Sequence, residues 1–407
     1  KCKWCSSRLN EVVPPEIPRN PNLILVGEAP GRTERDTKRP FTGESADFLR
    51  AIVREQNVRP IYINARTTWG PDKPTNETLK IEREAHLLPL LEAYPGVPVV
   101  ALGKYAAMAL LGGQQNEKKK AGEVLWLYDR LVLFTFHPAY YLYSDYDERI
   151  LEHIALHIAA ALRPVEKPKY FLDKFTKFLA PPFTNELVID DETDDDNYPW
   201  YGSRVVVMGI KPVGGIPHIF TSDFLKNKAN MQELKKRVEG ERVVIGHQLM
   251  FDLIHSEYEG LNFKQAHFHD TLIYMKNLGV EELSLGLKFH AKRLGFPAYE
   301  AKFHSVLRDK LPIREMNLTD LADYNARDLY ATEALYLQQK DESPGLFGMD
   351  MEYLHYIKTM TQNGLHVSKS KLDRRAADLQ REKDKLEGKV RRAYSLGKDF
   401  NIKSHVQ

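Results

Sequence analysis

The stretch Glu186–Thr193, ELVIDDET, joins an apolar run to a cluster of acids. The run favours a β-strand, and Asp190, Asp191 and Glu192 follow it directly. Side chains two residues apart on a strand share a face, so Asp190 and Glu192 point the same way. Two carboxylates held side by side repel each other unless a cation lies between them. The stretch alone leaves two interpretations open, a metal site and a solvated acidic loop.

Two later segments add acids to this pair. The segment Val243–Leu253, VVIGHQLMFDL, predicts a short buried strand, a break at its glycine and then Asp252 in apolar surroundings. The segment Tyr324–Thr332, YNARDLYAT, spaces Tyr324 and Asp328 four residues apart, so a helix presents both on one face. With these segments, the metal site becomes the favoured interpretation.

The three segments together resemble the 3′–5′ proofreading exonucleases of the DEDD superfamily, in the subtype with Tyr in its last motif. The family pattern is D-x-E on a first strand, then G-x-[NQ]-x-x-[FY]-D, then Y-x-x-x-D on a helix. Phe268–Leu272 and Leu283–Leu285 also look like the family's intermediate segments. One residue departs from the pattern, Gln248 in place of the usual Asn, and it concerns substrate positioning rather than metal binding.

The resemblance implies a two-metal site that hydrolyses phosphodiesters. The metal ligands would be Asp190, Glu192, Asp252 and Asp328, and Tyr324 would orient the attacking water. Carboxylate oxygens suit Mg²⁺ or Mn²⁺ rather than zinc. Two such ions activate the water and stabilise the leaving 3′ oxygen. The expected substrates are single-stranded 3′ ends and primer-template DNA.

The composition is that of an ordinary folded protein. The 407 residues predict two or three domains, and the net charge of +2 indicates no general attraction to nucleic acid. Any contact with DNA must therefore come from local patches of Lys and Arg. No apolar run reaches the length of a membrane span and no export signal is visible. We therefore expect no membrane partner and a cytoplasmic protein, in the host cell if the gene belongs to a phage.

We expect an α/β protein with two α/β domains followed by a helical, thumb-like segment. The first domain covers residues 1–163, a proline-rich linker 164–184, the second domain 185–345 and the helical segment 346–407. The first domain alternates strands and helices in a doubly wound pattern. Its expected strands are Leu23–Val26, Ile61–Ile63, Val99–Leu102 and Leu131–Phe136, and its expected helices include Ser45–Glu55 and Lys104–Leu111.

The last segment carries helical patterns. Ser370-x-x-Asp373 predicts the start of a helix. Apolar residues then recur every seven positions, which favours paired helices over a long coiled coil because the repeat is short. These residues are Leu372, Leu379, Leu386 and Ala393.

Residues that follow the strands of the first domain carry a second resemblance. Gly27–Leu49 reads GEAPGRTERDTKRPFTGESADFL, Asn64 ends another strand, and His137–Leu142 reads HPAYYL. These segments resemble the first and last motifs of the uracil-DNA glycosylase superfamily, most closely the class that usually carries an iron–sulfur cluster.

This second resemblance implies a role for each motif residue. Phe41 would stack on an extruded uracil, and Asn64 would read the edge of the base. His137 would stabilise the negative charge that develops on the departing base. Glu28 or Glu34 would position water or stabilise the sugar cation.

The chain departs from this class at its cluster ligands. Only Cys2 and Cys5 are present, and about Thr68 and Glu82 stand where the family has its third and fourth cysteines. A complete four-cysteine iron–sulfur cluster is therefore not expected. The two thiols either bind zinc with other ligands or are relics. The family's Asn-Arg after the third cysteine is also replaced, near Pro71–Asp72, so the grip on DNA is expected to differ.

Two hypotheses remain for the whole chain. Met351–Val367 and Phe400–Gln407 resemble the opening of the polymerase region in family A DNA polymerases. The first hypothesis is therefore the N-terminal part of a phage-type polymerase, with the rest of that polymerase and replication proteins as partners. The alternative is a free-standing repair nuclease whose glycosylase-like domain is a catalytically inert DNA-binding module. The chain begins at Lys1 rather than Met, so we expect residues before it.

Overall fold

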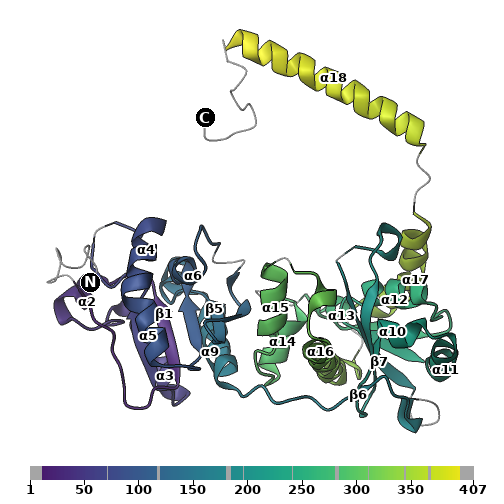
Figure 1. The fold of residues 1–407 in the computed structure, drawn as a ribbon, viewed down its shortest axis with the longest axis horizontal. Helices are drawn as coiled ribbons and strands as arrows, with labels where there is room; N and C mark the ends of the chain where they lie inside the picture. The colour runs from purple at the N-terminus through teal and green to yellow at the C-terminus, as the bar shows by residue number, and fades with distance from the viewer. Residues whose placement is uncertain are drawn as a thin grey trace. The chain divides into compact units, whose positions relative to one another are not determined.

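The fold is described by a computed structural model (Figure 1). The described residues are 12–70, 72–116, 120–179, 185–195, 197–240, 242–279, 284–309, 311–342, 345–364 and 368–394. The chain forms two compact units, residues 1–355 and 356–407, and both β-sheets belong to the first. Cys2, Cys5, Leu283 and Phe400–Gln407 lie outside the described residues, so the predictions made for them have no structural counterpart.

The first sheet is mostly parallel, and its strands run in the order β2-β1-β3-β5-β4. Only the β4–β5 pair is antiparallel. The strands are β1 (Leu23–Gly27), β2 (Pro60–Asn64), β3 (Val99–Leu102), β4 (Val124–Leu127) and β5 (Arg130–Thr135). Four of these contain most of the stretches expected as strands from the sequence, and the expected alternation with helices is confirmed.

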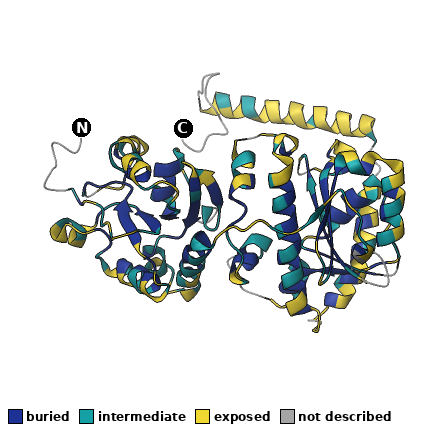
Figure 2. Ribbon diagram, turned by 60° about the horizontal axis from the view of Figure 1, so that its bottom comes forward, coloured by how far each residue is buried: buried dark blue, intermediate teal, exposed yellow. Residues whose placement is uncertain are grey.

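Helices cover both faces of this sheet because successive strand residues point to opposite sides. On one face, Leu23 and Leu25 of β1 pack with apolar residues of α3 (Glu44–Glu55) and α9 (Glu148–Leu162). On the other face, Ile24 and Val26 pack in a second core. That core also contains residues of α4 (Asn76–Glu82), η2 (Arg83–Leu87), α5 (Leu88–Ala93) and α6 (Gly103–Leu111). All residues of β1 are buried, as Figure 2 shows for the strands.

The second sheet is mixed and has the strand order β11-β10-β7-β8-β9-β6. Strand β7 (Glu186–Thr193) runs parallel to β10 (Val243–Gly246), which in turn pairs in parallel with β11 (His267–Asp270). On its other side, β7 pairs antiparallel with β8 (Val205–Pro212), and β8 does the same with β9 (His218–Thr221). The stretch ELVIDDET is therefore an interior strand, in contact with neighbours on both sides.

The predicted linker 164–184 contributes to this sheet. Within it, β6 (Phe171–Leu172) pairs in parallel with β9 at the sheet edge, and η3 (Lys177–Leu179) follows. Leu179 is fully buried in the core beside β7. The described part of the segment is thus packed against the second sheet, which the count of prolines did not reveal.

Helix α16 (Leu318–Gln339) packs against the strands of the second sheet with a long buried face. The opposite face of the sheet carries a second core, to which Phe347, Met351 and Leu354 of α17 (Phe347–Asn363) contribute. The remaining helices of this part are η4 (Pro199–Tyr201), α10 (Ser222–Lys226), α11 (Lys228–Val238), α12 (Met250–Glu259), α13 (Thr271–Asn277), α14 (Leu287–Arg293), α15 (Ala301–Arg308) and η5 (Ile313–Glu315). The α2 (Arg32–Thr37) and α8 (Ala139–Tyr143) helices belong with the first sheet.

Helix α18 (Lys369–Ala393) starts earlier than the sequence predicted. Its N-cap is Ser368, where the backbone is still extended (φ −71°, ψ 107°), so Ser370 lies inside the first turn. No described residue of α18 is buried, as the exposed colouring in Figure 2 shows. The predicted pairing of helices is therefore not seen among residues 368–394. Among the described residues, no helix is both long and apolar enough to cross a membrane.

Candidate active sites

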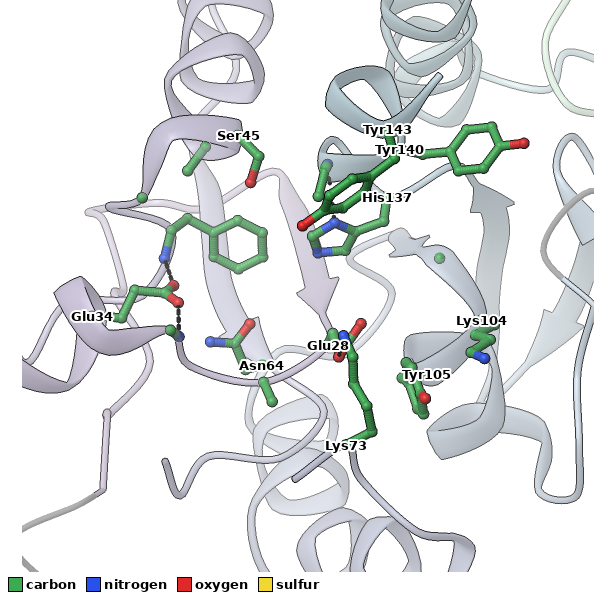
Figure 3. A pocket seen from close by; sticks show the side chains of 17 residues that line it. Glu28, Glu34, Ser45, Asn64, Lys73, Lys104, Tyr105, His137, Tyr140 and Tyr143 are labelled. Atoms are coloured by element: carbon green, nitrogen blue, oxygen red, sulfur yellow. Dashed lines mark hydrogen bonds and ion pairs between the residues drawn. The ribbon is translucent and has the colours of Figure 1, made fainter. Parts of the chain in front are cut away.

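The first candidate site is a pocket of about 430 Å³ at the carboxyl ends of the parallel strands of the first sheet. Residues that directly follow or end these strands line it, as is usual for ligand sites in α/β folds. Figure 3 shows Glu28, Asn64 and His137 around the same space. The lining also includes Glu34, Phe41, Lys73, Tyr105, Tyr140 and Tyr143. All five glycosylase-motif residues named from the sequence thus line one pocket.

The ring of Phe41 is held by an unusual backbone conformation. Phe41 has a positive φ of 55°, which is costly for a residue with a bulky side chain. Two contacts hold it there: its N–H donates to the carboxylate of Glu34, and its carbonyl accepts from Nε of Arg50 at 2.8 Å. The other oxygen of Glu34 accepts from the N–H of Gly31. Both oxygens of Glu34 are therefore used to fix the loop that carries Phe41.

Asn64 offers an unused donor to the pocket. Its side chain is 6% exposed, and its Nδ2 has no hydrogen-bond partner among the described residues. A buried amide without a partner is costly unless a ligand completes it. The close approach of Asn64 requires Gly27, because a Cβ there would lie 2.6 Å from Asn64 Oδ1 and 2.6 Å from Cζ of Phe41.

His137 is held as a neutral hydrogen-bond donor. The N–H of Ala139 donates to Nδ1 of His137 at 3.1 Å, so Nδ1 carries no hydrogen and Nε2 is the protonated nitrogen. Burial lowers the pKa of His137, opposed by the carboxylate of Glu28 and assisted by the ammonium of Lys73. The imidazole is therefore neutral near pH 7, with its proton on Nε2.

Glu28 has a partner that the sequence did not suggest. Lys73 Nζ lies 2.7 Å from Glu28 Oε1, and this hydrogen bond raises the pKa of Lys73. Lys73 lies in the loop after β2, close to Pro71–Asp72, where the sequence predicted an altered grip on DNA. The one feature of the sequence that could have indicated Lys73 as a site residue is its place after the end of a strand. The side chain of Lys73 is 73% exposed, so we assign no stability to the pair.

We predict that Gly27→Ala destabilises the first sheet and the helices that cover it, which together we call the first α/β unit. The added methyl group overlaps Asn64 and Phe41, and overpacking of this kind costs about 1–3 kcal/mol. Gly43→Ala is the matched control, since a Cβ at this pocket-lining glycine meets nothing within 4 Å. Urea unfolding followed by circular dichroism compares the free energies of unfolding. Equal stabilities of the two variants would contradict the close approach at Gly27.

The second candidate site is a cluster of carboxylates on the second sheet. Asp190 and Glu192 of β7 and Asp328 of α16 each offer an oxygen, and these oxygens lie within 4.8 Å of one another. Asp252 stands beside them, where its Oδ1 accepts the backbone N–H of Asp191 at 2.8 Å. The shared face of Asp190 and Glu192, expected from strand geometry, is what brings both toward α16.

Burial and crowding favour the protonated forms of Asp190, Glu192 and Asp252 when no cation is present. Burial and the nearby Asp328 carboxylate raise the pKa of Asp190 to about 8. Burial, and then the neighbouring acids, likewise raise the pKa of Glu192 and of Asp252. A divalent cation would relieve this repulsion, and an all-oxygen donor set fits Mg²⁺ or Mn²⁺.

Tyr324 lies at the edge of the cluster. Its ring stacks on Phe303 with centroids 4.0 Å apart. Burial and the Asp328 carboxylate raise the pKa of Tyr324, so it keeps its hydroxyl proton near neutral pH. The ammonium of Lys288 lies 4.2 Å from the centre of the Tyr324 ring and pairs with Asp328. Tyr299 also donates its hydroxyl to Asp328.

Asn325 orients the first carboxylate of the cluster. Its Nδ2 donates to Oδ2 of Asp190 at 2.7 Å and to the carbonyl of the same residue at 2.9 Å. Asn325 is fully buried, and a Cβ at Gly209 would lie only 2.0 Å from its Oδ1. Sequence reasoning missed Asn325, Lys288 and Tyr299 because their partners are distant in the chain. The one feature of the sequence that could have indicated Asn325 as a site residue is its position directly after Tyr324.

We predict that binding of Mn²⁺ to this cluster strengthens as the pH rises toward 8. The raised pKa values mean that protons must leave before the metal binds, which gives about tenfold in affinity per pH unit for each proton released. The stability of the metal-free fold changes in the opposite direction, because the contribution of a carboxyl whose pKa is raised from 3.8 to about 8 is fully present below the lower value and is lost as the pH rises to the higher one. Calorimetric titration with Mn²⁺ at a series of pH values up to 8 measures the affinity of the cluster for the ion. A pH-independent affinity, or one that Asp190→Asn leaves unchanged, would contradict the assignment.

Comparison with known proteins gives a clear result for the first sheet and its helices. Residues 14–155 match the family model of the uracil DNA glycosylase superfamily. A type-4 uracil-DNA glycosylase of Thermotoga maritima is 32% identical over 184 residues, which covers 43% of this chain and 91% of that protein. The type-4 enzyme of Pyrobaculum aerophilum is 31% identical over 130 residues, covering 30% of this chain and 65% of its own length.

Comparison with solved structures gives only weak similarities. Brucella melitensis NrnC is 16% identical with a TM-score of 0.34, covering 49% of this chain and 94% of that protein. A structure described as the apo form of a nuclease has a TM-score of 0.37 at 17% identity, with coverages of 49% and 95%. Scores of this size carry no argument about the second sheet, whose chemistry must be judged from its own residues.

Proposed function

The chain belongs to the uracil-DNA glycosylase superfamily through its first α/β unit, and we propose that the pocket at Asn64 and His137 removes uracil from DNA. The observation that carries this proposal is the buried amide of Asn64, a residue that lines the pocket and whose Nδ2 has no partner among the described residues. A donor of this kind fits a carbonyl oxygen of uracil. Fixed by Glu34, the ring of Phe41 supplies an apolar wall for the same base.

The reaction follows from the positions of these groups. The base must leave the DNA stack before its glycosidic bond is accessible. When the bond between sugar C1′ and the base nitrogen breaks, the electron pair stays on uracil, and the Nε2–H of His137 donates to the oxygen that becomes negative. Water adds to C1′, and the proton that it loses neutralises the departing uracil anion, with the carboxylate of Glu28 as the nearby anion for the sugar cation. The products are free uracil and an abasic site.

We predict that His137→Ala lowers uracil excision by about 100- to 1,000-fold, the usual effect of removing one donor to a developing oxyanion. Uracil-containing single-stranded DNA is incubated with the full chain in EDTA, and abasic sites are counted by alkaline cleavage. The chelator silences any metal-dependent nuclease. His267→Ala, at an exposed histidine of β11, is the control and should match the wild type. DNA binding without any abasic product from the wild type would favour an inert DNA-binding module instead.

A second activity, metal-dependent 3′–5′ exonuclease, is supported by the carboxylate cluster. Asp190, Glu192 and Asp328 meet closely enough to share a cation, and Asp252 lies next to them. These residues would hold Mg²⁺ or Mn²⁺, which on binding would activate water and stabilise the leaving oxygen of a phosphodiester. Asn325 keeps Asp190 turned toward the cluster, and Tyr324 remains a neutral hydroxyl that can orient water.

We predict that Asp190→Ala with Glu192→Ala abolishes Mg²⁺-dependent digestion of a mismatched 3′ end. The remaining oxygens cannot hold the cation against the solvent, so digestion should fall to the level seen in EDTA. Asp223→Ala, at an acid whose side chain is 90% exposed, serves as the control for the loss of a negative charge. Gel assays of a 5′-labelled primer follow the shortening. Undiminished digestion by the double variant would remove the assignment.

DNA is the common substrate of both proposed activities. The wider hypothesis of a family A polymerase, and its rival of a free-standing repair nuclease, stay predictions from the sequence. The two reactions are separable by experiment, because the first proceeds in EDTA and the second requires a divalent ion.

A further inference from the structure

Glu82 is a buried carboxylate that belongs to neither proposed site. It ends α4 and is 0% exposed. Its Oε2 accepts from the backbone N–H of Thr67 at 3.1 Å and from Oγ1 of the same residue at 2.7 Å, and its Oε1 accepts from Oγ1 of Thr68 at 2.8 Å. Burying a carboxylate is costly without such donors. Both oxygens of Glu82 therefore accept hydrogen bonds from the loop that follows β2.

The same loop also holds the N-terminal segment. The N–H of Val13 donates to the carbonyl of Thr67 at 2.9 Å, and Val12 forms an antiparallel bridge with Thr68. Thr67 and Thr68 thus lie between two partners, the N-terminal segment and the end of α4. Three stretches that are distant in the sequence meet at one buried point.

The sequence resemblance relates this point to the iron–sulfur cluster that the resembling class of glycosylases usually carries. By resemblance, Thr68 and Glu82 stand about where that class has its third and fourth cluster cysteines. The donor set here consists of hydroxyls and one carboxylate, each already engaged within the protein. With two cysteines in the whole sequence, the residues do not fit a cluster that four thiolates hold.

We propose that the hydrogen-bonded group of Glu82, Thr67 and Thr68 replaces the iron–sulfur cluster as the link between the N-terminal segment, the loop after β2 and helix α4. A cluster joins such segments through four covalent metal–sulfur bonds. Here the carboxylate joins the loop to the helix, and the backbone bridge at Val12 joins the loop to the N-terminal segment. The first α/β unit accordingly folds without a cluster.

The first test measures metal in the full chain. Protein purified with and without oxygen is assayed for iron, acid-labile sulfide and zinc. The expected result is no stoichiometric metal under either condition. Stoichiometric iron or zinc would overturn the proposal. It would mean that Cys2 and Cys5 complete a site with other donors, such as Glu82 and His86, whose Oε2 and Nε2 lie 3.7 Å apart.

The second test measures the link itself by hydrogen–deuterium exchange. Thr68→Val keeps the shape of the side chain and removes one donor, while Glu82→Met keeps the length and removes all acceptors. Exchange in residues 12–16 and 65–70 should become about tenfold faster in each, since losing a buried charge-assisted hydrogen bond shifts local opening by that order. Glu84→Met, at an exposed glutamate of the next turn, is the control.

The outcomes of the exchange experiment are distinct. Should Glu82→Met fail to fold, Thr68→Val still reports on the link, since only a hydroxyl is lost. Unchanged exchange in Thr68→Val and in a folded Glu82→Met would overturn the proposal. Because neither measurement uses DNA, the result does not depend on whether the pocket excises uracil.

A third variant tests the two positions directly. The combination of Thr68→Cys and Glu82→Cys is reconstituted with ferrous iron and sulfide, and the iron bound per chain is compared with the wild type. Uptake by the double variant alone supports the view that these positions once supplied ligands. A double variant that keeps its fold, by circular dichroism, and takes up no iron would overturn their assignment to the cluster position.

Discussion

The free-energy cost of burying a polar group without a partner connects the two candidate sites. In the first, the amide of Asn64 is buried and its Nδ2 has no partner among the described residues, a cost that a ligand able to accept from it would remove. In the second, three carboxylates share one small space, and burial together with the neighbouring acids raises the pKa values of Asp190 and Glu192. The first site has a buried donor that lacks an acceptor, and the second has more carboxylates than the single ammonium of Lys288 pairs with. The first feature indicates a ligand with a hydrogen-bond acceptor, and the second indicates a cation.

In both sites, neighbouring residues hold the candidate functional side chains in place. The two carboxylate oxygens of Glu34 accept hydrogen bonds from the backbone amides of Gly31 and Phe41, and this holds Phe41 at a positive φ. On the second sheet, Asn325 fixes Asp190, and Gly209 leaves the space that Asn325 occupies. The residues that would touch substrate are therefore positioned by others that would not. Glu34, which sequence reasoning paired with Glu28 as a candidate for the reaction itself, has a structural task that explains its carboxylate without such a role.

Local patterns were sufficient to predict the strands and the α/β class, because a buried strand is recognisable from a run of a few apolar residues. The run ahead of Asp190 and the strand that ends at Asn64 are examples. Partners from distant segments were not predictable in the same way. Glu82 resembles any helical glutamate, and only the folded chain shows that Thr67 and Thr68 occupy both of its oxygens. Similarly, the two residues of β6 carry too little pattern to mark a strand, and they become one only by pairing with β9. The start of α18 was misjudged by two residues, since Ser368 and Ser370 are chemically identical candidates for an N-cap.

The hydrogen bond from the backbone amide of Asp191 to Asp252 has a consequence for how this protein can evolve. The donor belongs to the main chain, so the bond does not depend on the chemistry of the side chain at position 191, and only proline removes it outright. A replacement that fits the buried site of Asp191, where Ser256 donates to its carboxylate, therefore leaves the carboxylate of Asp252 with the same donor. A homologue with another residue at position 191 would therefore still hold the carboxylate of Asp252 in the same orientation.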